Sequence, residues 1–230
     1  MVSPHYDDAP LSVGQSMLDG ALANHSVTVG IVFGRSNWTR WFHPTRGRMP
    51  AVTAIRYAEE RLNAHRFGYR VRTGGLEEAI LRLGTTDTTE FLDPGYPARD
   101  TPEREAVARM LMTWTDGVDG MLLPLGVGGH IDHRIVAAVA PDLTVPVAFY
   151  EDRPYACGLD DEALAAIATS VDPTLRPRTI SGPITEAKTR RLWYPSQFDP
   201  FFVDAMGADI ADRRLERIWV RDSSHPLAHA

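Results

Sequence analysis

The sequence predicts an α/β protein with a Rossmann-like, three-layer fold, a mostly parallel sheet and an active site at the carboxyl ends of the strands. Short apolar runs alternate along the chain with helix-like stretches, as they do in βαβ units. Clusters of His and Asp follow the apolar run at the start of the chain and the one near residue 124. In open α/β sheets ligands bind at the carboxyl ends of such strands. We expect one domain over residues 1–222, and a flexible tail over 223–230, where no packing pattern is visible.

The expected strands are short and rich in apolar or β-branched residues. They cover residues 27–33, 120–124, 145–150 and, late in the chain, 217–221. The expected helices cover residues 11–23, 51–65, 103–115, 133–140, 160–170 and 186–193. Two longer stretches, 34–50 and 85–101, are expected as loops. The first of these crowds tryptophans and arginines between a strand and a helix.

Composition excludes several classes of protein. The chain has 230 residues, of which 43% are hydrophobic and 23% charged, with a net charge of -6. An acidic chain is a poor candidate for nucleic-acid binding, and no apolar run reaches the length of a membrane span. Cys157 is the single cysteine, which rules out an internal disulfide and favours a cytoplasmic location.

The first polar cluster is His5-Tyr6-Asp7-Asp8, between the apolar start of the chain and an expected helix. Neighbouring carboxylates repel each other unless a cation or a proton lies between them. In one arrangement His5 and Asp8 bind a metal, and Asp7 acts as a base. Imidazole with carboxylate suits zinc. The alternative is that the Asp pair only caps the following helix, since carboxylates satisfy free N–H groups at helix starts.

The second cluster, His130-Ile131-Asp132-His133, follows a glycine-rich turn at the end of the expected strand 120–124. If both clusters face one crevice, His133 becomes a third metal ligand beside His5 and Asp8. His130 is then left to stabilise developing negative charge or to protonate a leaving group. Asp132 is expected to orient His130 through its ring N–H and to favour the imidazolium. The glycines do not form a dinucleotide-binding fingerprint, which disfavours a nucleotide-binding enzyme.

These paired motifs resemble the PIG-L / LmbE-like family of zinc-dependent N-deacetylases, which carry His-x-Asp-Asp near the N-terminus and His-x-Asp-His in mid-chain. Further similarities are Val32-Phe33-Gly34, Arg56-x-x-Glu59-Glu60, Pro124-Leu-Gly, Lys188 and Tyr194-x-Ser196-Gln197, so that the resemblance runs from about residue 3 to about residue 200. It implies zinc ligands His5, Asp8 and His133, with Asp7 as general base, His130 as electrostatic or acid partner and Asp132 as its orienter. It also implies hydrolysis of the amide of an N-acetylated amino sugar. Zn²⁺ is the expected cofactor, with another divalent ion such as Fe²⁺ as the alternative.

The chain departs from the family pattern in two places. Ala9 stands where many members have Glu, so a contact made by that Glu is lost. Only four residues precede His5, where the family usually has a longer first strand. Either the first strand is very short, or the natural start lies upstream.

For the substrate, an N-acyl small molecule, we expect contacts from Arg40, Trp41, Arg56 and Tyr155. Residues 150–155 close the expected strand 145–150, so we expect this segment to line the same crevice. Aromatic faces stack on sugars and arginines grip anions, so the arginine-rich loop favours a substrate with an anionic group. The alternative is a solvated loop whose tryptophans pack on the body of the protein. For Arg56 the alternative is an ion pair with Glu59 or Glu60 on its own helix.

Two other functions stay open at this stage. One is a deformylase or another small-molecule amidase with the same zinc site. Another is a binding protein that retains the metal without turnover, although such a protein needs neither Asp7 nor His130. The oligomeric state is also open, a homo-oligomer included.

Overall fold

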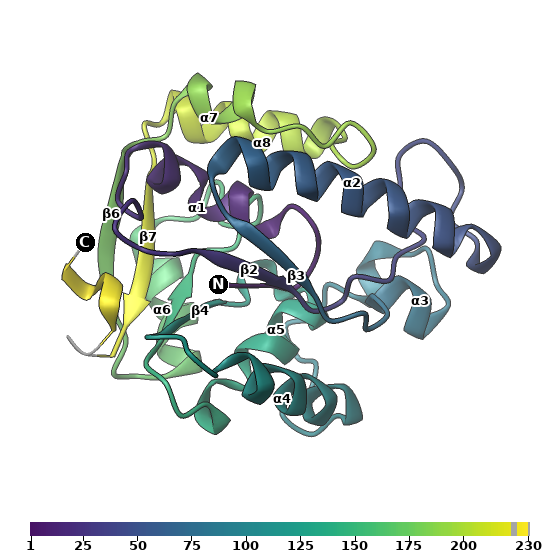
Figure 1. Ribbon diagram of the computed structural model, residues 1–230, viewed down its shortest axis with the longest axis horizontal. Helices are drawn as coiled ribbons and strands as arrows, with labels where there is room; N and C mark the ends of the chain where they lie inside the picture. Colours follow the sequence, from purple (N-terminus) through teal and green to yellow (C-terminus); the bar gives the residue numbers. More distant parts are fainter. Residues whose placement is uncertain (222–224, 230) are drawn as a thin grey trace.

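The computed structural model describes residues 1–221 and 225–229 (Figure 1). The strands are β1 (Val2–Ser3), β2 (Thr28–Ile31), β3 (Arg70–Thr73), β4 (Met121–Pro124), β5 (Val147–Tyr150), β6 (Arg176–Pro183) and β7 (Leu215–Val220). The α-helices are α1 (Asp8–Leu18), α2 (Met49–Phe67), α3 (Ala79–Leu83), α4 (Pro102–Trp114), α5 (Ile131–Ala137), α6 (Asp161–Val171), α7 (Glu186–Arg191) and α8 (Pro200–Ala211). Short 3₁₀ turns occupy Arg46–Arg48, Thr88–Glu90, Val127–Gly129, Ala140–Asp142 and Pro226–His229.

The central layer is built from two hydrogen-bonded ladders. Strands β1, β2 and β3 pair in parallel, and β4 pairs in parallel with β5. The layer continues through β7, which runs antiparallel to both β5 and β6. Strands β1 and β4 lie close to each other, so the carboxyl ends of β1, β4 and β5 are neighbours. The predicted fold class, three layers around a mostly parallel sheet, is confirmed.

Alternate residues of the strands face opposite helix layers. Leu123 and Phe149 pack in one core with α4, α5 and α6, while their neighbours Leu122 and Ala148 pack in another core with α1. The other end of that second face is covered by α2 and α8 (Figure 1). Period-two alternation between two buried faces explains why these strands read as continuous apolar runs in the sequence.

One glycine allows close packing between a helix and the sheet. An added Cβ at Gly30 would lie 2.3 Å from the ring of Trp114, which lies flat on β2. Only glycine leaves room for this contact, and the indole covers the strand where a side chain would otherwise stand.

The predicted strands and helices are confirmed as elements, with ends that differ by a few residues, and four elements were not predicted. The missed elements are β3, β6, α3 and α8. Strand β3 alternates arginine with small residues because it is an edge strand, and β6 contains prolines that only an edge strand tolerates. Helix α3 is too short to show a helical period.

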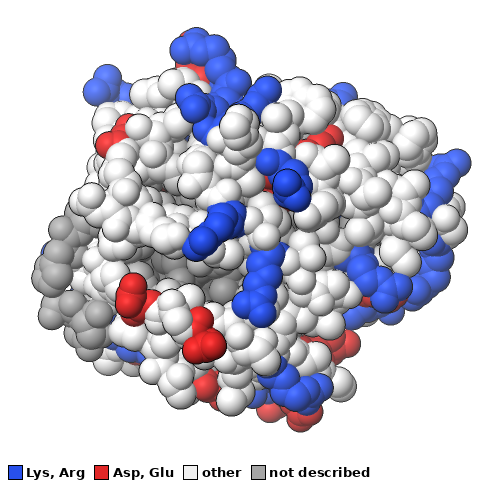
Figure 2. Space-filling model, in the orientation of Figure 1, with Lys and Arg blue, Asp and Glu red and all other residues white. Residues whose placement is uncertain are grey.

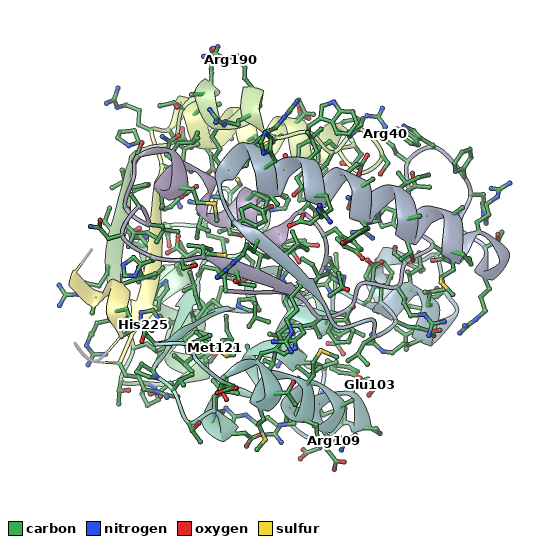
Figure 3. The ribbon with its side chains drawn as sticks, in the orientation of Figure 1. Arg40, Glu103, Arg109, Met121, Arg190 and His225 are labelled. Atoms are coloured by element: carbon green, nitrogen blue, oxygen red, sulfur yellow. The ribbon has the colours of Figure 1, made fainter. Side chains whose placement is uncertain are left out.

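Part of the expected flexible tail is buried in the structure. Residues 222–224 and 230 lie outside the described residues. His225 and Leu227, by contrast, are buried, and His225 Nε2 lies 3.1 Å from the carbonyl oxygen of Met121 (Figure 3). A hydrogen-bonded imidazole and an apolar side chain thus pack this segment against β4 and β7, and its flexibility stays a prediction. Within the described residues, no helix combines the length and apolarity needed to cross a bilayer.

Candidate active site

The first polar cluster lies in the turn between β1 and α1. The side chain of Ser3 donates to the carbonyl of His5 over 2.8 Å, and Asp8 accepts the backbone N–H of His5 over 2.7 Å. Asp7 adopts a φ of +93°, a region that costs a non-glycine residue about 1–3 kcal/mol. The turn therefore holds a strained aspartate close to His5, whose backbone N–H and C=O are both bonded to side chains, which is typical of a functional site.

The second cluster lies in the turn between β4 and α5. Gly126, Gly128 and Gly129 all have positive φ values, which lets the chain fold back within a few residues. An added Cβ at Gly128 would lie 2.5 Å from Tyr155, so this turn packs directly on the loop after β5. The glycines thus place His130 just before α5 and His133 in its first turn.

A third contribution comes from the end of β5. Asp152 is fully buried, and one of its oxygens accepts the N–H groups of Gly126 and Val127 over 2.8 and 2.9 Å. Its other oxygen lies 2.6 Å from Nδ1 of His133. Sequence reasoning placed this segment near the crevice but gave Asp152 no role. Its position directly after an apolar strand was the available signal.

The three expected metal ligands converge on one point. His5 Nδ1 lies 3.3 Å from His133 Nε2, and Asp8 Oδ2 lies 3.4 Å from each of these nitrogens. The centre of such a triangle is about 1.9 Å from every corner, and zinc bonds to nitrogen and oxygen are about 2.0–2.2 Å long. The donor set therefore fits an ion of the size of zinc.

The outer nitrogens of the two ligand histidines are each held by a buried carboxylate. Asp132 Oδ2 lies 2.9 Å from His5 Nε2, and Asp152 holds His133. Carboxylates in these positions fix the tautomer and ring orientation of metal-binding histidines. Burial alone would lower the pKa of His5, but the hydrogen bonds to Asp132 and Asp8 outweigh it and raise the pKa to about 10. This excess of negative charge favours a bound cation.

The geometry corrects the role expected of Asp132. Its carboxylate binds His5, the backbone N–H of Ala79 and the guanidinium of Arg82, not the ring of His130. Nδ1 of His130 instead accepts the backbone N–H of Asp132 over 3.2 Å. Burial and the charge of His5 lower the pKa of His130 well below its usual range, which favours the neutral imidazole over the expected imidazolium. In the neutral ring, the hydrogen bond that Nδ1 accepts leaves the proton on Nε2.

The rings of His5, His130 and His133 also form a cluster of their own, with one nitrogen from each lying within 4.8 Å of the others. His130 is thus an alternative third ligand to Asp8. We favour Asp8 because its oxygen completes the tighter triangle. In addition, no carboxylate among the described residues holds the outer nitrogen of His130 in the way that Asp132 and Asp152 hold the other two rings.

Asp7 stands apart from this network. No hydrogen bond from the described residues reaches its carboxylate, which lines a cavity beside the metal ligands. Burial, reinforced by the neighbouring charge of Asp8, raises the pKa of Asp7 well above its ordinary value. A buried carboxylate with a raised pKa at the edge of a cavity is suited to accept and return a proton.

The cavity beside the cluster has a volume of about 400 Å³, within the range of small-molecule sites. Its lining mixes the polar cluster with aromatic and apolar side chains: His5, Asp7, Asp8, Trp38, Arg56, Glu78, Ala79, Ile80, Phe91, Leu92, His130, Tyr155, Gln197, Asp199, Phe201 and Phe202. Three of the large apolar residues exposed on the protein surface, Trp38, Leu92 and Phe201, stand in this lining. The open side of the cavity is therefore apolar.

Of the four expected substrate contacts, two reach the cavity. Tyr155 and Arg56 line it, but the guanidinium of Arg56 is buried and bonded to Glu78 and Ser36. Arg40 binds the carbonyl of Phe198 and lies at the outer edge of the molecule (Figure 3), and Trp41 does not line the cavity. The backbone N–H of Arg40 is bonded to the carbonyl of Ser196, and neither Arg40 nor Trp41 is brought into the lining of the cavity.

Basic side chains form no continuous surface on the face shown in Figure 2, where uncharged and acidic residues separate them. Within the lining of the cavity, the only arginine is Arg56, and its charge is balanced by Glu78. Among the described residues that line the cavity, the one arginine is therefore paired, and an anionic group on the substrate stays a prediction.

The His and Asp side chains thus gather at the carboxyl ends of parallel strands. In open α/β proteins this edge of the sheet is where ligands bind, so the fold and the site define an α/β protein with a polar binding centre at that edge. No protein-family model matches the chain. The chain is 34% identical over 217 residues to 2'-N-acetylparomamine deacetylase of Streptomyces fradiae, covering 86% of this chain and 73% of that protein. It belongs to the family of deacetylases that includes this enzyme.

Solved structures of deacetylases share the fold. A teicoplanin-pathway deacetylase superposes with a TM-score of 0.62 at 19% identity, covering 96% of this chain and 97% of that chain. The zinc-inhibited form of teicoplanin deacetylase gives a TM-score of 0.60 at 18% identity, with the same coverage. The A40926 pseudoaglycone deacetylase gives 0.56 at 21% identity, covering 95% and 94% of the two chains.

Proposed function

We propose that this chain is a zinc-dependent N-deacetylase of the PIG-L / LmbE-like type, which removes an acetyl group from the amide nitrogen of an amino sugar. One observation carries the proposal: the donor triangle of His5, Asp8 and His133 stands beside an unbonded carboxylate, Asp7, at the wall of a substrate-sized cavity. The deacetylase that this chain matches supports the same chemistry.

His5, Asp8 and His133 would hold the metal. When bound, zinc would act as a Lewis acid and would lower the pKa of a bound water molecule to about 7. Fe²⁺ is the alternative that the same nitrogen and oxygen donors accept. Asp132 and Asp152 keep the inner nitrogens of the two histidines turned toward this position.

Asp7 serves as the general base. Its carboxylate takes a proton from the attacking water as the water oxygen bonds to the amide carbon, and it returns a proton to the nitrogen as the carbon–nitrogen bond breaks. The products are acetate and the free amine. The raised pKa of Asp7 brings its proton affinity closer to that of the groups it must exchange with.

His130 stabilises the oxygen that becomes negative during the attack. Because its Nδ1 accepts a backbone N–H, its Nε2 carries a proton that faces the cavity, where it acts as a hydrogen-bond donor. A donor that is fixed before the reaction does not need to reorganise when charge develops.

The lining of the cavity supports a neutral or cationic sugar as the substrate. Trp38, Tyr155 and Phe201 offer aromatic faces for the apolar side of a sugar ring. Asp199 and Asp7 leave the cavity with an acidic balance that favours further amines on the substrate. The relative from Streptomyces fradiae is named for an N-acetylated amino sugar, and we propose the same class of substrate here. A deformylase or another amidase would use the same groups and differ only in the acyl pocket.

The proposal is tested with Asp7→Asn, since asparagine tolerates the positive φ of this position. We expect the variant to keep its zinc while kcat/KM on an N-acetylated amino sugar falls by about 100- to 10,000-fold. Asp212→Asn, on the exposed C-terminal end of α8, is the matched control and should keep full activity. Full turnover by Asp7→Asn would overturn the role of Asp7. Faster cleavage of the N-formyl analogue than of the N-acetyl substrate would favour the deformylase.

We also propose that the enzyme acts in the cytoplasm as one domain. The support is its single cysteine, Cys157, which is unpaired in the structure.

A further inference from the structure

Asp132 has more than one partner, and only one of them is a ligand of the proposed metal centre. Its side chain is fully buried, with Oδ2 shared by His5 and the backbone N–H of Ala79 and Oδ1 placed 2.6 Å from Nη2 of Arg82. We propose that Arg82 is a positioning residue of this centre, which acts through Asp132 to hold the ring of His5 in its metal-binding orientation. This inference rests on the metal centre of the proposed function.

Arg82 is itself held on several sides. A second guanidinium nitrogen donates to the carbonyl of Glu77 over 2.6 Å, and the guanidinium lies 4.8 Å from the ring centre of Phe33. A weaker ion pair joins it to Glu103 at 3.7 Å. These contacts fix the orientation of the planar guanidinium. They therefore also fix the direction from which Arg82 approaches Asp132.

The contact sets both the charge and the rotation of the Asp132 carboxylate. A buried carboxylate without a cationic partner is costly, and Arg82 supplies a permanent positive charge at one oxygen. The other oxygen is then directed at Nε2 of His5, 127 positions away in the sequence. With its outer nitrogen engaged in this way, the His5 ring turns Nδ1 toward Asp8 and His133.

The two ligand histidines, His133 and His5, are therefore supported differently. Asp152, behind His133, is held by backbone N–H groups of the glycine-rich turn, which no single substitution of a side chain removes. Asp132, behind His5, accepts one backbone N–H, that of Ala79, but its second oxygen depends on the side chain of Arg82. Both partners lie in α3, a short helix whose first residues also line the cavity. A substitution of Arg82 should therefore loosen the orientation of the His5 ring and leave that of His133 unchanged.

The experiment measures zinc binding by competition with a chelator, using zinc alone as the probe, for the wild type and three variants. We expect Arg82→Gln to weaken zinc binding by about 10- to 100-fold, as loss of such supporting partners typically does. Arg82→Lys should bind zinc more tightly than Arg82→Gln, because lysine restores the positive charge but not the planar hydrogen-bonding geometry of the guanidinium. Arg104→Gln is the matched control: Arg104 is also partly buried, pairs with Asp142 at 2.6 Å and does not line the cavity.

The Co²⁺-substituted proteins give a second readout. The visible absorption of Co²⁺ should change in Arg82→Gln and stay unchanged in Arg104→Gln, because only the former alters a ligand's orientation. Activity of Arg82→Gln should return toward the wild-type level at saturating zinc, which a general loss of folding would not allow.

Each outcome separates the two claims. If the wild type binds no zinc, the proposed function fails. If the wild type binds zinc and Arg82→Gln binds it equally well with the same Co²⁺ spectrum, the proposed function stands and the role of Arg82 is wrong. Equal weakening in Arg82→Gln and Arg104→Gln would also overturn that role, since it would show only a loss of stability.

Discussion

Nδ1 of His5 lies 3.3 Å from Nε2 of His133, although the two residues are 128 positions apart in the chain. Each ring has its opposite nitrogen on a buried carboxylate, Asp132 for His5 and Asp152 for His133. Two ring nitrogens this close need a cation between them. The raised pKa of His5 indicates that a proton takes this place in the metal-free protein. A metal ion would replace that proton, which is the basis of the proposed metal centre.

Loss of the carboxylate behind His133 should weaken metal binding. In Asp152→Asn the ring keeps a hydrogen-bond partner of the same shape but loses the charge that makes it a strong donor to metal. We expect zinc affinity to fall by about 10- to 100-fold, measured by chelator competition. Asp160→Asn, which alters an exposed helix cap that accepts the N–H of Ala163, should leave zinc affinity unchanged. Unchanged zinc affinity in Asp152→Asn would refute the supporting role of Asp152.

The aromatic residues at the open side of the cavity should set the affinity for a sugar. Trp38→Ala and Phe201→Ala should each raise KM for an N-acetyl amino sugar by about 5- to 10-fold with little change in kcat, since one stacked ring contributes about 1 kcal/mol. Trp41→Ala is the control, because Trp41 is exposed on the same loop as Trp38 but does not line the cavity. An equal rise in KM for Trp41→Ala would place the substrate elsewhere.

The stability of the fold should depend on a buried ion pair that does not line the cavity. Lys188, the single lysine of the chain, lies 2.8 Å from Glu216, which is fully buried and also accepts two backbone N–H groups. Lys188→Met leaves that carboxylate without a cation and should lower the free energy of unfolding by about 3–5 kcal/mol in urea titrations.

The control for this variant is on the same helix. Arg190 points into solvent (Figure 3) and pairs with Glu186 where both side chains are more than two-thirds exposed. Arg190→Met should change stability by less than about 0.5 kcal/mol. Similar decreases in the free energy of unfolding in the two variants would show that the buried Lys188–Glu216 pair stabilises the fold no more than an exposed pair does.

Stability should also fall with pH through His225. Burial lowers the pKa of this residue from 6.5 to about 4. Its Nε2 lies 3.1 Å from the carbonyl of Met121, and its Nδ1 accepts the N–H of Leu227. Between these two pKa values the unfolded chain binds a proton that the folded protein refuses, so the free energy of unfolding decreases as pH drops from about 6.5 to about 4.

The expected size of this effect is at most about 3.5 kcal/mol, from about 1.4 kcal/mol for each pKa unit. The measurement compares urea unfolding across that pH range for the wild type and His225→Asn. The variant should lose less stability on acidification, whereas His65→Asn, at an exposed position of α2, should follow the wild type. Identical pH profiles for the wild type and His225→Asn would contradict the assignment.

The sequence allowed the centre to be predicted because each cluster follows a strand directly. His5 and Asp8 come after β1, and His133 comes after β4, so parallel topology brings them to the same edge. The partner of Asp132 was not predictable in this way. It is decided by Arg82, on a helix too short to leave a periodic pattern, and by the reach of a side chain across 50 positions.

The expected substrate contacts also differ in how far the sequence could predict them. Tyr155 was expected at the cavity because it follows β5, and the structure places it there. Arg40 was expected there from its composition alone. Its actual position is set by hydrogen bonds to Ser196 and Phe198, and no local signal in the sequence marks contacts between segments so far apart.

The most direct test of the account is the metal content of the purified protein, measured by elemental analysis beside the double variant Asp8→Ala/His133→Ala. The account predicts about one zinc or iron ion per chain in the wild type, since three protein donors form one site, and none retained by the variant. A wild-type protein that binds no metal when zinc is offered at neutral pH would contradict it. A variant that keeps its metal would contradict it as well.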